Sequence, residues 1–256
     1  MAPDAGIVGD VPVGLPPWPG TWPTGEQYSP ELLRDGDTRN VADEFRYWTE
    51  TAIRAELDNR LVKQPKLWIA IENLHHDFNI GSIVRTANAF NVAGVYIVGG
   101  KRWNRRGAMV TDRYLHITHV NTAPELQQKI QHAPQHAVQQ ELQQAPQMEI
   151  QPGIHYEAQH EIHYDRQHQV HREGQQGANP IPIIGIDNIP GSIPIETYAF
   201  PPECLLVFGQ ESTGLTPEMQ AICQDIVHIT QYGSTRSINA GAAAAIAMFA
   251  WSSQNR

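Results

Sequence analysis

The chain has few cysteines, no long apolar run and no excess of positive charge. Its two cysteines, Cys204 and Cys223, lie far apart and outside any Cys-x-x-Cys spacing, so neither a disulfide framework nor a structural metal is indicated. The longest apolar run, 240–251, is shorter than the roughly 20 residues of a membrane-spanning helix. The N-terminus has no basic segment followed by an apolar one. These features predict a cytoplasmic protein with no membrane segment.

The formal net charge of −9 argues against indiscriminate binding of nucleic acid, because phosphate neutralisation supplies most of that affinity. One local exception is the segment KRWNRRGAMVTDRY at 101–114. Its cations surround two aromatic rings, Trp103 and Tyr114, and are Lys101, Arg102, Arg105, Arg106 and Arg113. Cations that bind phosphate and rings that stack on bases suit exposed RNA. A solvated loop after a strand explains the composition equally well.

Three kinds of composition divide the chain. Residues 1–38 are rich in Pro and Gly and predict a tail or an extended arm, and 39–65 show apolar residues at helical spacing. A segment at about 123–180 is rich in Gln and His and interrupts the main domain at 66–256. Its spaced histidines have no metal-binding frame, so we expect no metal site.

Apolar strands alternate with helical segments from residue 66 onward. KLWIAIENL, GVYIVGG, IPIIGID, ECLLVFG and DIVHIT have the strand pattern, and the segments between several of them are helical or turn-like. This alternation predicts an α/β domain with a mostly parallel sheet and helices on both faces. No strand is followed by Gly-x-Gly-x-x-Gly and no phosphate-binding loop is present, which weakens a dehydrogenase or NTPase interpretation.

Three polar segments follow strands or open helices. NIGSIVRTANAF at 79–90 begins with Asn79, which can cap the helix that follows, and carries Arg85 inside that helix. LLVFGQESTGL at 205–215 places Gly209 and Glu211 beyond the carboxyl end of a buried strand, where ligands bind in open α/β sheets. The last segment, 229–251, leads through a Gly-containing polar loop into a helix built almost entirely of alanine.

These segments together resemble the three ordered motifs of the SpoU/TrmH-like branch of the SPOUT RNA methyltransferases. The matching patterns are Asn79-x-Gly81-x-x-x-Arg85-Thr86-Ala87, Phe208-Gly209-x-Glu211-x-x-Gly214-Leu215 and Ile229-x-x-x-Gly233-x-x-x-Ser237-Ile238-Asn239. Thr230 stands where proline is common, and Ile238 replaces leucine. The likeness covers about 66–122 and 181–256, and leaves the arm and the Gln/His-rich insert unexplained.

The resemblance implies an α/β fold whose C-terminal segment forms a trefoil knot, a homodimer, and S-adenosylmethionine as cofactor. A segment threaded through a loop and wrapped around a cofactor must be slim, which accounts for Gly233, Gly241 and the alanines. Carried over residue by residue, the cofactor contacts fall on Gly209, Ile229, Gly233 and Ile238. The acceptor ribose is surrounded by Asn79, Arg85, Glu211, Ser237 and Asn239, and one subunit's Arg85 serves the cofactor of the other.

The reaction implied is transfer of a methyl group to a ribose 2′-hydroxyl of tRNA or rRNA, without a metal. We favour Arg85 as a phosphate clamp, because a guanidinium holds its proton far above neutral pH. Ser237 and Asn239 then orient the hydroxyl, or alternatively only cap the alanine helix. Lys101, Arg102, Arg105 and Arg106 are the expected RNA contacts. The competing hypothesis is a noncatalytic RNA-binding or assembly protein that keeps the knotted fold.

Overall fold

The computed structural model describes residues 14–73, 79–131, 180–210 and 213–256. The chain divides into two compact units, one made of Met1–Leu126 with Pro182–Arg256 and the other of Gln127–Ile181. The second unit is described only at its two ends. There the Gln131 carboxamide binds both the backbone N–H (2.9 Å) and the carbonyl (3.2 Å) of Ile181.

The first unit is built on a seven-stranded sheet with the order β3-β2-β1-β6-β4-β7-β5. All neighbouring strands in it are parallel. The strands are β1 (Leu67–Asn73), β2 (Gly94–Gly99), β3 (Ile117–Val120), β4 (Ile183–Ile186), β5 (Ile193–Pro194), β6 (Cys204–Phe208) and β7 (Asp225–His228). Every residue of β1, β4 and β6 is buried, which explains why these strands read as continuous apolar runs.

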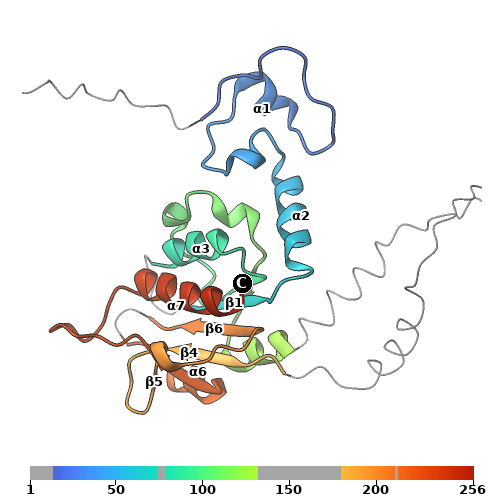
Figure 1. The fold of residues 1–256 in the computed structure, drawn as a ribbon. Helices are drawn as coiled ribbons and strands as arrows, with labels where there is room; N and C mark the ends of the chain where they lie inside the picture. Colours follow the sequence, from blue (N-terminus) through green and yellow to red (C-terminus); the bar gives the residue numbers. More distant parts are fainter. Residues whose placement is uncertain (1–13, 74–78, 132–179, 211–212) are drawn as a thin grey trace, which may run out of the picture. The chain divides into compact units, whose positions relative to one another are not determined.

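Helices cover the central strands. Helix α3 (Ile80–Ala89) and helix α7 (Ala240–Asn255) lie on one side of the sheet, and helix α6 (Pro217–Ile222) lies on the other (Figure 1). Residues 123–131 are also helical. Four short 3₁₀ helices complete the described elements: η1 (Asp43–Phe45), η2 (Arg105–Ala108), η3 (Thr111–Tyr114) and η4 (Ile195–Thr197). The predicted α/β class with a parallel sheet is confirmed.

The N-terminal part differs from the sequence-based expectation. The described residues of the supposed arm include helix α1 (Pro30–Asp35), capped by Ser29. Asp37 is fully buried, where it binds the Arg39 guanidinium at 2.7 Å and the Tyr47 backbone N–H at 2.8 Å. The next helix, α2 (Glu50–Leu61), begins well after residue 39, because Tyr47 has a left-handed backbone (φ 63°) and Thr49 caps the helix.

Helix α7 owes its small residues to close packing on α3. A Cβ atom at Gly241 would lie 3.2 Å from the Ser82 Cβ atom of α3. Further along, Ala244, Ala247 and Trp251 are fully buried. The Trp251 indole N–H donates to the Pro201 carbonyl at 3.0 Å, so a buried polar group is satisfied. The opposite face of α7 exposes Ile246 (40%) and Phe249 (64%).

None of the helices within the described ranges is both long enough and apolar enough to span a bilayer. The trefoil knot stays a prediction.

Candidate functional site

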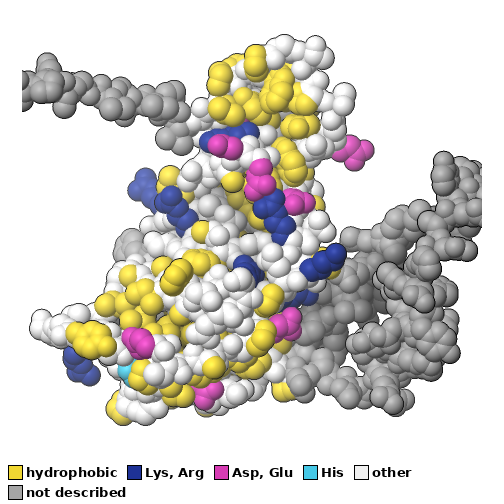
Figure 2. All heavy atoms as spheres, in the orientation of Figure 1, with side chains coloured by type: hydrophobic (Ala, Val, Ile, Leu, Met, Phe, Trp, Pro, Cys, Tyr) yellow, Lys and Arg dark blue, Asp and Glu magenta, His cyan; other side chains and the backbone are white. Residues whose placement is uncertain are grey.

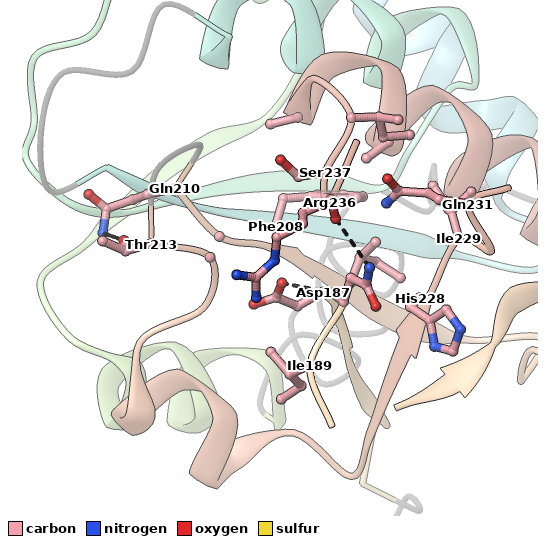
Figure 3. Close-up of a pocket in the computed structure, with 17 residues that line it drawn as sticks. Asp187, Ile189, Phe208, Gln210, Thr213, His228, Ile229, Gln231, Arg236 and Ser237 are labelled. Carbon is pink, nitrogen blue, oxygen red and sulfur yellow. Dashed lines mark hydrogen bonds between the residues drawn. The ribbon is translucent and has the colours of Figure 1, made fainter. Parts of the chain in front are cut away.

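A pocket of about 470 Å³ lies at the carboxyl ends of β4, β6 and β7. The last residue of each strand, Ile186, Phe208 and His228 respectively, contributes to its wall. Residues of the loop that leads from β7 into α7 close another side (Figure 3). Parallel strands present their carboxyl ends at one edge, so three distant segments meet there.

Three of the four residues assigned to the cofactor line this pocket. They are Gly209, Ile229 and Ile238. Gly233 does not line it, and a Cβ atom at Gly233 would meet no protein atom within 4 Å. The protein's own packing therefore does not require glycine at 233, and a contact of Gly233 with the cofactor stays a prediction.

Glycine is required at two positions of the loop after β6. Gln210 and Gly214 exchange two backbone hydrogen bonds of 3.0 and 2.9 Å. A Cβ atom at Gly209 would overlap the backbone of Gly214 and Leu215. Gly214 has a left-handed backbone (φ 68°), and a Cβ atom there would overlap the Asp187 carboxylate. A side chain at either position would therefore displace part of this loop.

Two carboxylates from different strands anchor the end of this loop. Asp187, directly after β4, accepts a hydrogen bond from the Leu215 backbone N–H at 2.8 Å. Glu72 of β1 is 3% exposed and accepts from both the backbone N–H (2.9 Å) and the hydroxyl (2.6 Å) of Thr216. Burial raises the pKa of the Glu72 carboxyl, and the hydrogen bonds from Thr216 oppose this only in part. Successive residues of the loop are thus held by acids on two strands.

Asn79 and Asn239 join the first and third motifs. The Asn239 amide donates to the Asn79 side-chain oxygen at 2.9 Å, across 160 residues of sequence. The Asn239 side-chain oxygen also accepts hydrogen bonds from the backbone N–H groups of Gly241 and Ala242, and so caps α7. Helix capping was the expected alternative to a catalytic role for Asn239. Asn79 occupies the capping position of α3, but its side chain makes no capping bond there, so that expectation is wrong. The N-termini of α3 and α7 are instead linked side chain to side chain.

The remaining ribose-site residues are placed differently from one another. Ser237 is exposed and lines the pocket. Arg85 is exposed on α3, and within the described part of the chain it does not line this pocket. Glu211 lies outside the described residues. A single chain therefore does not bring Arg85 to the same wall as Ser237.

Hydrogen bonds and close packing hold the basic segment 101–114 against β1 and α3. The Asn73 amide at the end of β1 donates to the carbonyls of Gly100 (2.6 Å) and Arg102 (2.9 Å). A Cβ atom at Gly81 would come within 2.8 Å of the backbone of η2, so α3 and η2 pack without a gap. The four predicted cations are exposed: Lys101, Arg102, Arg105 and Arg106.

The aromatic rings of this segment differ in availability. Arg105 lies over the Trp103 ring at 5.5 Å and pairs with Asp112 at 3.3 Å. Tyr114 is buried with Phe45 and Ile53, so its ring cannot stack on a base as the sequence suggested. The four cations at 101–106 are therefore exposed to solvent, whereas the Tyr114 ring is not. Acidic and basic side chains are otherwise interspersed on the face drawn in Figure 2.

Sequence reasoning missed several polar residues in the pocket wall: Asp187, Asn188, Gln210, His228, Gln231 and Arg236. The signal for Asp187 was present, because it directly follows the strand IPIIGID at its carboxyl end. Burial raises the pKa of Cys204 and of Cys223 to about 12, so both thiols stay protonated at neutral pH. In the part of the chain that the structure describes, no cluster of His, Cys, Asp or Glu could hold a metal ion.

The pocket, the glycine turn and the linked asparagines all fall within one family match. Residues 66–249 match the model of the SpoU rRNA Methylase family, which is more than half of the chain. The chain belongs to this family. The SpoU match includes the three motifs found in the sequence and the basic segment, and it leaves out the first 65 residues.

Comparisons with individual SpoU proteins are more distant. The chain is 36% identical over 58 residues to the 23S rRNA (guanosine-2′-O-)-methyltransferase RlmB of Acinetobacter baylyi, which is 23% of each chain. The structure is similar to that of the SpoU methyltransferase AviRb from Streptomyces viridochromogenes in complex with AdoMet. That match has a TM-score of 0.52 and 21% identity, and covers 77% of this chain and 61% of AviRb.

A second solved structure, the TrmH/SpoU tRNA modifying enzyme of A. aeolicus, matches with a TM-score of 0.50 and 18% identity. The match covers 80% of this chain and 81% of the A. aeolicus chain. The chain spans less than two thirds of the RlmB and AviRb chains that it matches. At these identities the solved structures establish the fold.

Proposed function

We propose that the protein transfers the methyl group of S-adenosylmethionine to a ribose 2′-hydroxyl in tRNA or rRNA. The observation that carries this proposal is the convergence of Gly209, Ile229, Ser237 and Ile238 on one pocket at the carboxyl edge of a SpoU sheet. Of the similar proteins named above, RlmB is a 23S rRNA (guanosine-2′-O-)-methyltransferase, AviRb is a SpoU methyltransferase in complex with AdoMet, and the A. aeolicus protein is a tRNA modifying enzyme. The alternative, a noncatalytic RNA-binding protein, is an outcome of the experiment below.

The pocket fits a nucleoside-sized cofactor. Its volume of about 470 Å³ falls in the range of small-molecule sites, and apolar walls from Ile186, Phe208 and Ile238 suit a planar base.

The residues at the pocket mouth suit positioning of an alcohol. A bound sulfonium cofactor supplies an already activated methyl group, so the protein has to align the attacking oxygen and assist the loss of one proton. Ser237 lines the pocket, and the Asn79–Asn239 pair holds the N-terminus of α7 beside it. Arg85 supplies a positive charge that binds phosphate and favours the ionised hydroxyl.

Arg85 acts, in this proposal, across a homodimer. It is exposed and has no hydrogen bond or ion pair with the described residues, and it does not line the pocket of its own chain. Ile246 and Phe249 give α7 an exposed apolar face of the kind that protein interfaces bury. A second chain on this face would bring its Arg85 toward a pocket that lacks it.

The decisive experiment measures cofactor binding and product together. Purified protein is titrated calorimetrically with S-adenosylhomocysteine, and is separately incubated with S-adenosylmethionine carrying a labelled methyl group and unmodified tRNA or rRNA transcripts. The digested RNA is analysed for 2′-O-methyl nucleosides by mass spectrometry. A Gly209→Trp variant, with its fold checked by circular dichroism, is the matched control for both measurements.

Saturable binding and a 2′-O-methyl nucleoside, both absent in the Gly209→Trp variant, are the expected results. Binding of RNA without cofactor binding would overturn the proposal in favour of the noncatalytic alternative. A methylated base in place of a methylated ribose would overturn the reaction while keeping the cofactor.

A further inference from the structure

Two opposite charges face the same pocket from different segments. Asp187 follows β4 directly, and Arg236 lies in the loop between β7 and α7. Both side chains line the pocket, and Figure 3 shows the Arg236 guanidinium and the Asp187 carboxylate turned to the same part of it. Neither residue belongs to the polar positions of the three motifs.

The two charges do not neutralise each other. Within the described ranges, Arg236 makes no ion pair, and its guanidinium has no hydrogen-bond partner. Other exposed arginines do pair with carboxylates, as Arg34 does with Asp35 at 2.9 Å and Arg113 with Glu50 at 2.6 Å. Arg236 is thus left without a carboxylate partner although Asp187 lines the same pocket, and a ligand that lies between the two charges explains this arrangement.

Hydrogen bonds fix the positions of both Asp187 and the loop that carries Arg236. The Asp187 oxygens accept from the backbone N–H groups of Asn188 and Leu215, both at 2.8 Å, which fixes the carboxylate and leaves further lone pairs open. The Asn188 amide donates to the Arg236 carbonyl at 3.2 Å. This bond holds the loop that carries Arg236 against the end of β4, so the facing arrangement is built into the fold.

We infer that Arg236 and Asp187 bind the α-amino acid end of S-adenosylmethionine. The guanidinium of Arg236 binds the α-carboxylate, and the carboxylate of Asp187 binds the α-ammonium group. In an amino acid the ammonium and carboxylate charges lie within a few bonds of each other, which matches the opposite charges of Arg236 and Asp187 on the pocket wall. An RNA phosphate at Arg236 would instead lie close to the like charge of Asp187 and be repelled. This inference rests on the proposed function.

The test compares three ligands that share the adenosine and differ in the amino acid end. S-adenosylhomocysteine carries both charges, its decarboxylated form S-adenosyl-3-thiopropylamine carries the ammonium group without the carboxylate, and 5′-methylthioadenosine carries neither. Each is titrated calorimetrically into wild type, Arg236→Ala, Asp187→Asn and the control Arg34→Ala. Arg34 is exposed and lies outside the pocket, so its variant removes an arginine without touching the site.

Hydrogen bonds to charged groups predict the size of the effect. Arg236→Ala should weaken S-adenosylhomocysteine about 10- to 100-fold and leave the other two ligands within about twofold. Asp187→Asn should weaken both ligands that carry the ammonium group and spare 5′-methylthioadenosine. Unchanged affinity for 5′-methylthioadenosine also shows that each variant pocket is folded.

Several results would overturn the inference. Equal weakening of all three ligands would place Asp187 or Arg236 on the nucleoside or in the pocket's framework. Unchanged affinity for S-adenosylhomocysteine in both variants would remove them from the cofactor site. A wild-type protein that binds none of the three ligands would instead contradict the proposed function, so the two failures are distinguishable.

Discussion

Glu72 in β1 binds Thr216, the capping residue of α6, through both the hydroxyl at 2.6 Å and the backbone N–H at 2.9 Å, across 144 residues of sequence. The pairing of β1 with β6 makes this contact possible, because the loop after β6 returns over the end of β1. Thr216 also accepts from the Met219 backbone N–H at 3.2 Å, so one hydroxyl links a buried acid to a helix start. The hydrogen bonds between Glu72 and Thr216 hold the end of the loop that contains Gly209 and Gly214.

The raised pKa of Glu72 predicts a pH-dependent effect of Glu72→Gln. The folded protein holds the Glu72 proton more tightly than the unfolded chain, so the contribution of Glu72 to stability is full at low pH and falls as pH rises through its folded pKa. The free energy of unfolding of Glu72→Gln should therefore improve relative to wild type as pH rises above about 4.5. Urea unfolding at several pH values measures this difference.

Glu203→Gln is the matched control for that prediction, because Glu203 is an exposed glutamate directly before β6. Its difference from wild type should not follow the same trend. A difference for Glu72→Gln that is constant with pH would contradict the buried acid as the cause.

Substitution of Gly209 by alanine should weaken the binding of the cofactor. The new Cβ atom overlaps the backbone of Gly214 and Leu215, and overpacking of this kind costs about 1–3 kcal/mol. The loop must move, and we expect affinity for S-adenosylhomocysteine to fall about tenfold or more by calorimetry. Ser253→Ala is the control, because Ser253 is exposed and does not line the pocket. Equal affinities of Gly209→Ala and wild type would refute the requirement for glycine.

Reversal of two charges in the basic segment should weaken the binding of RNA. Arg105→Glu with Arg106→Glu replaces exposed cations next to α3 and should lower affinity for tRNA or rRNA transcripts, with a salt dependence reduced by a slope of roughly 1 or more. Filter binding at several salt concentrations measures both. Affinity for S-adenosylhomocysteine should stay unchanged.

The control for this prediction is Arg34→Glu with Lys63→Glu, which changes the net charge equally at exposed positions outside the segment. RNA affinity that falls equally in the two double variants would attribute the effect to net charge, and the segment would lose its assignment as the RNA contact.

The exposed face of α7 predicts a dissociated variant. Ile246→Glu with Phe249→Glu puts two charges on the apolar surface proposed to pair with a second chain, so association should weaken at least about tenfold. Sedimentation velocity over a range of concentrations measures the change. Val62→Glu is the control, because Val62 is 53% exposed and lies outside α7. A wild-type protein that sediments as a monomer at all concentrations would contradict the homodimer.

Much of the fold could be read from local patterns. The fully buried strands β1, β4 and β6 appear in the sequence as short apolar runs, and their alternation with helices predicts a parallel sheet. The start of α2 could not be read in this way. The apolar spacing continues through Phe45 and Trp48, but the left-handed backbone at Tyr47 and the cap at Thr49 delay the helix.

The candidate site was predictable where it depends on motifs. Gly209, Ile229, Ser237 and Ile238 follow from the resemblance to the SpoU family and line the pocket. Family membership itself is confirmed, whereas the knot, the homodimer and the individual site roles stay predictions. Tyr114 shows the limit, because a ring next to cations in sequence is buried against Phe45 and Ile53 in space.

The sequence by itself determined the α/β class, the family and the three motif segments, because these depend on periodicity and on residue order along the chain. The tertiary structure decided which side chains meet. Asn79 reaches Asn239, Glu72 reaches Thr216, and Asp187 faces the same pocket as Arg236. The physical reason is strand order: β6 lies between β1 and β4 in the sheet, so acids at the ends of strands distant in sequence meet the same loop.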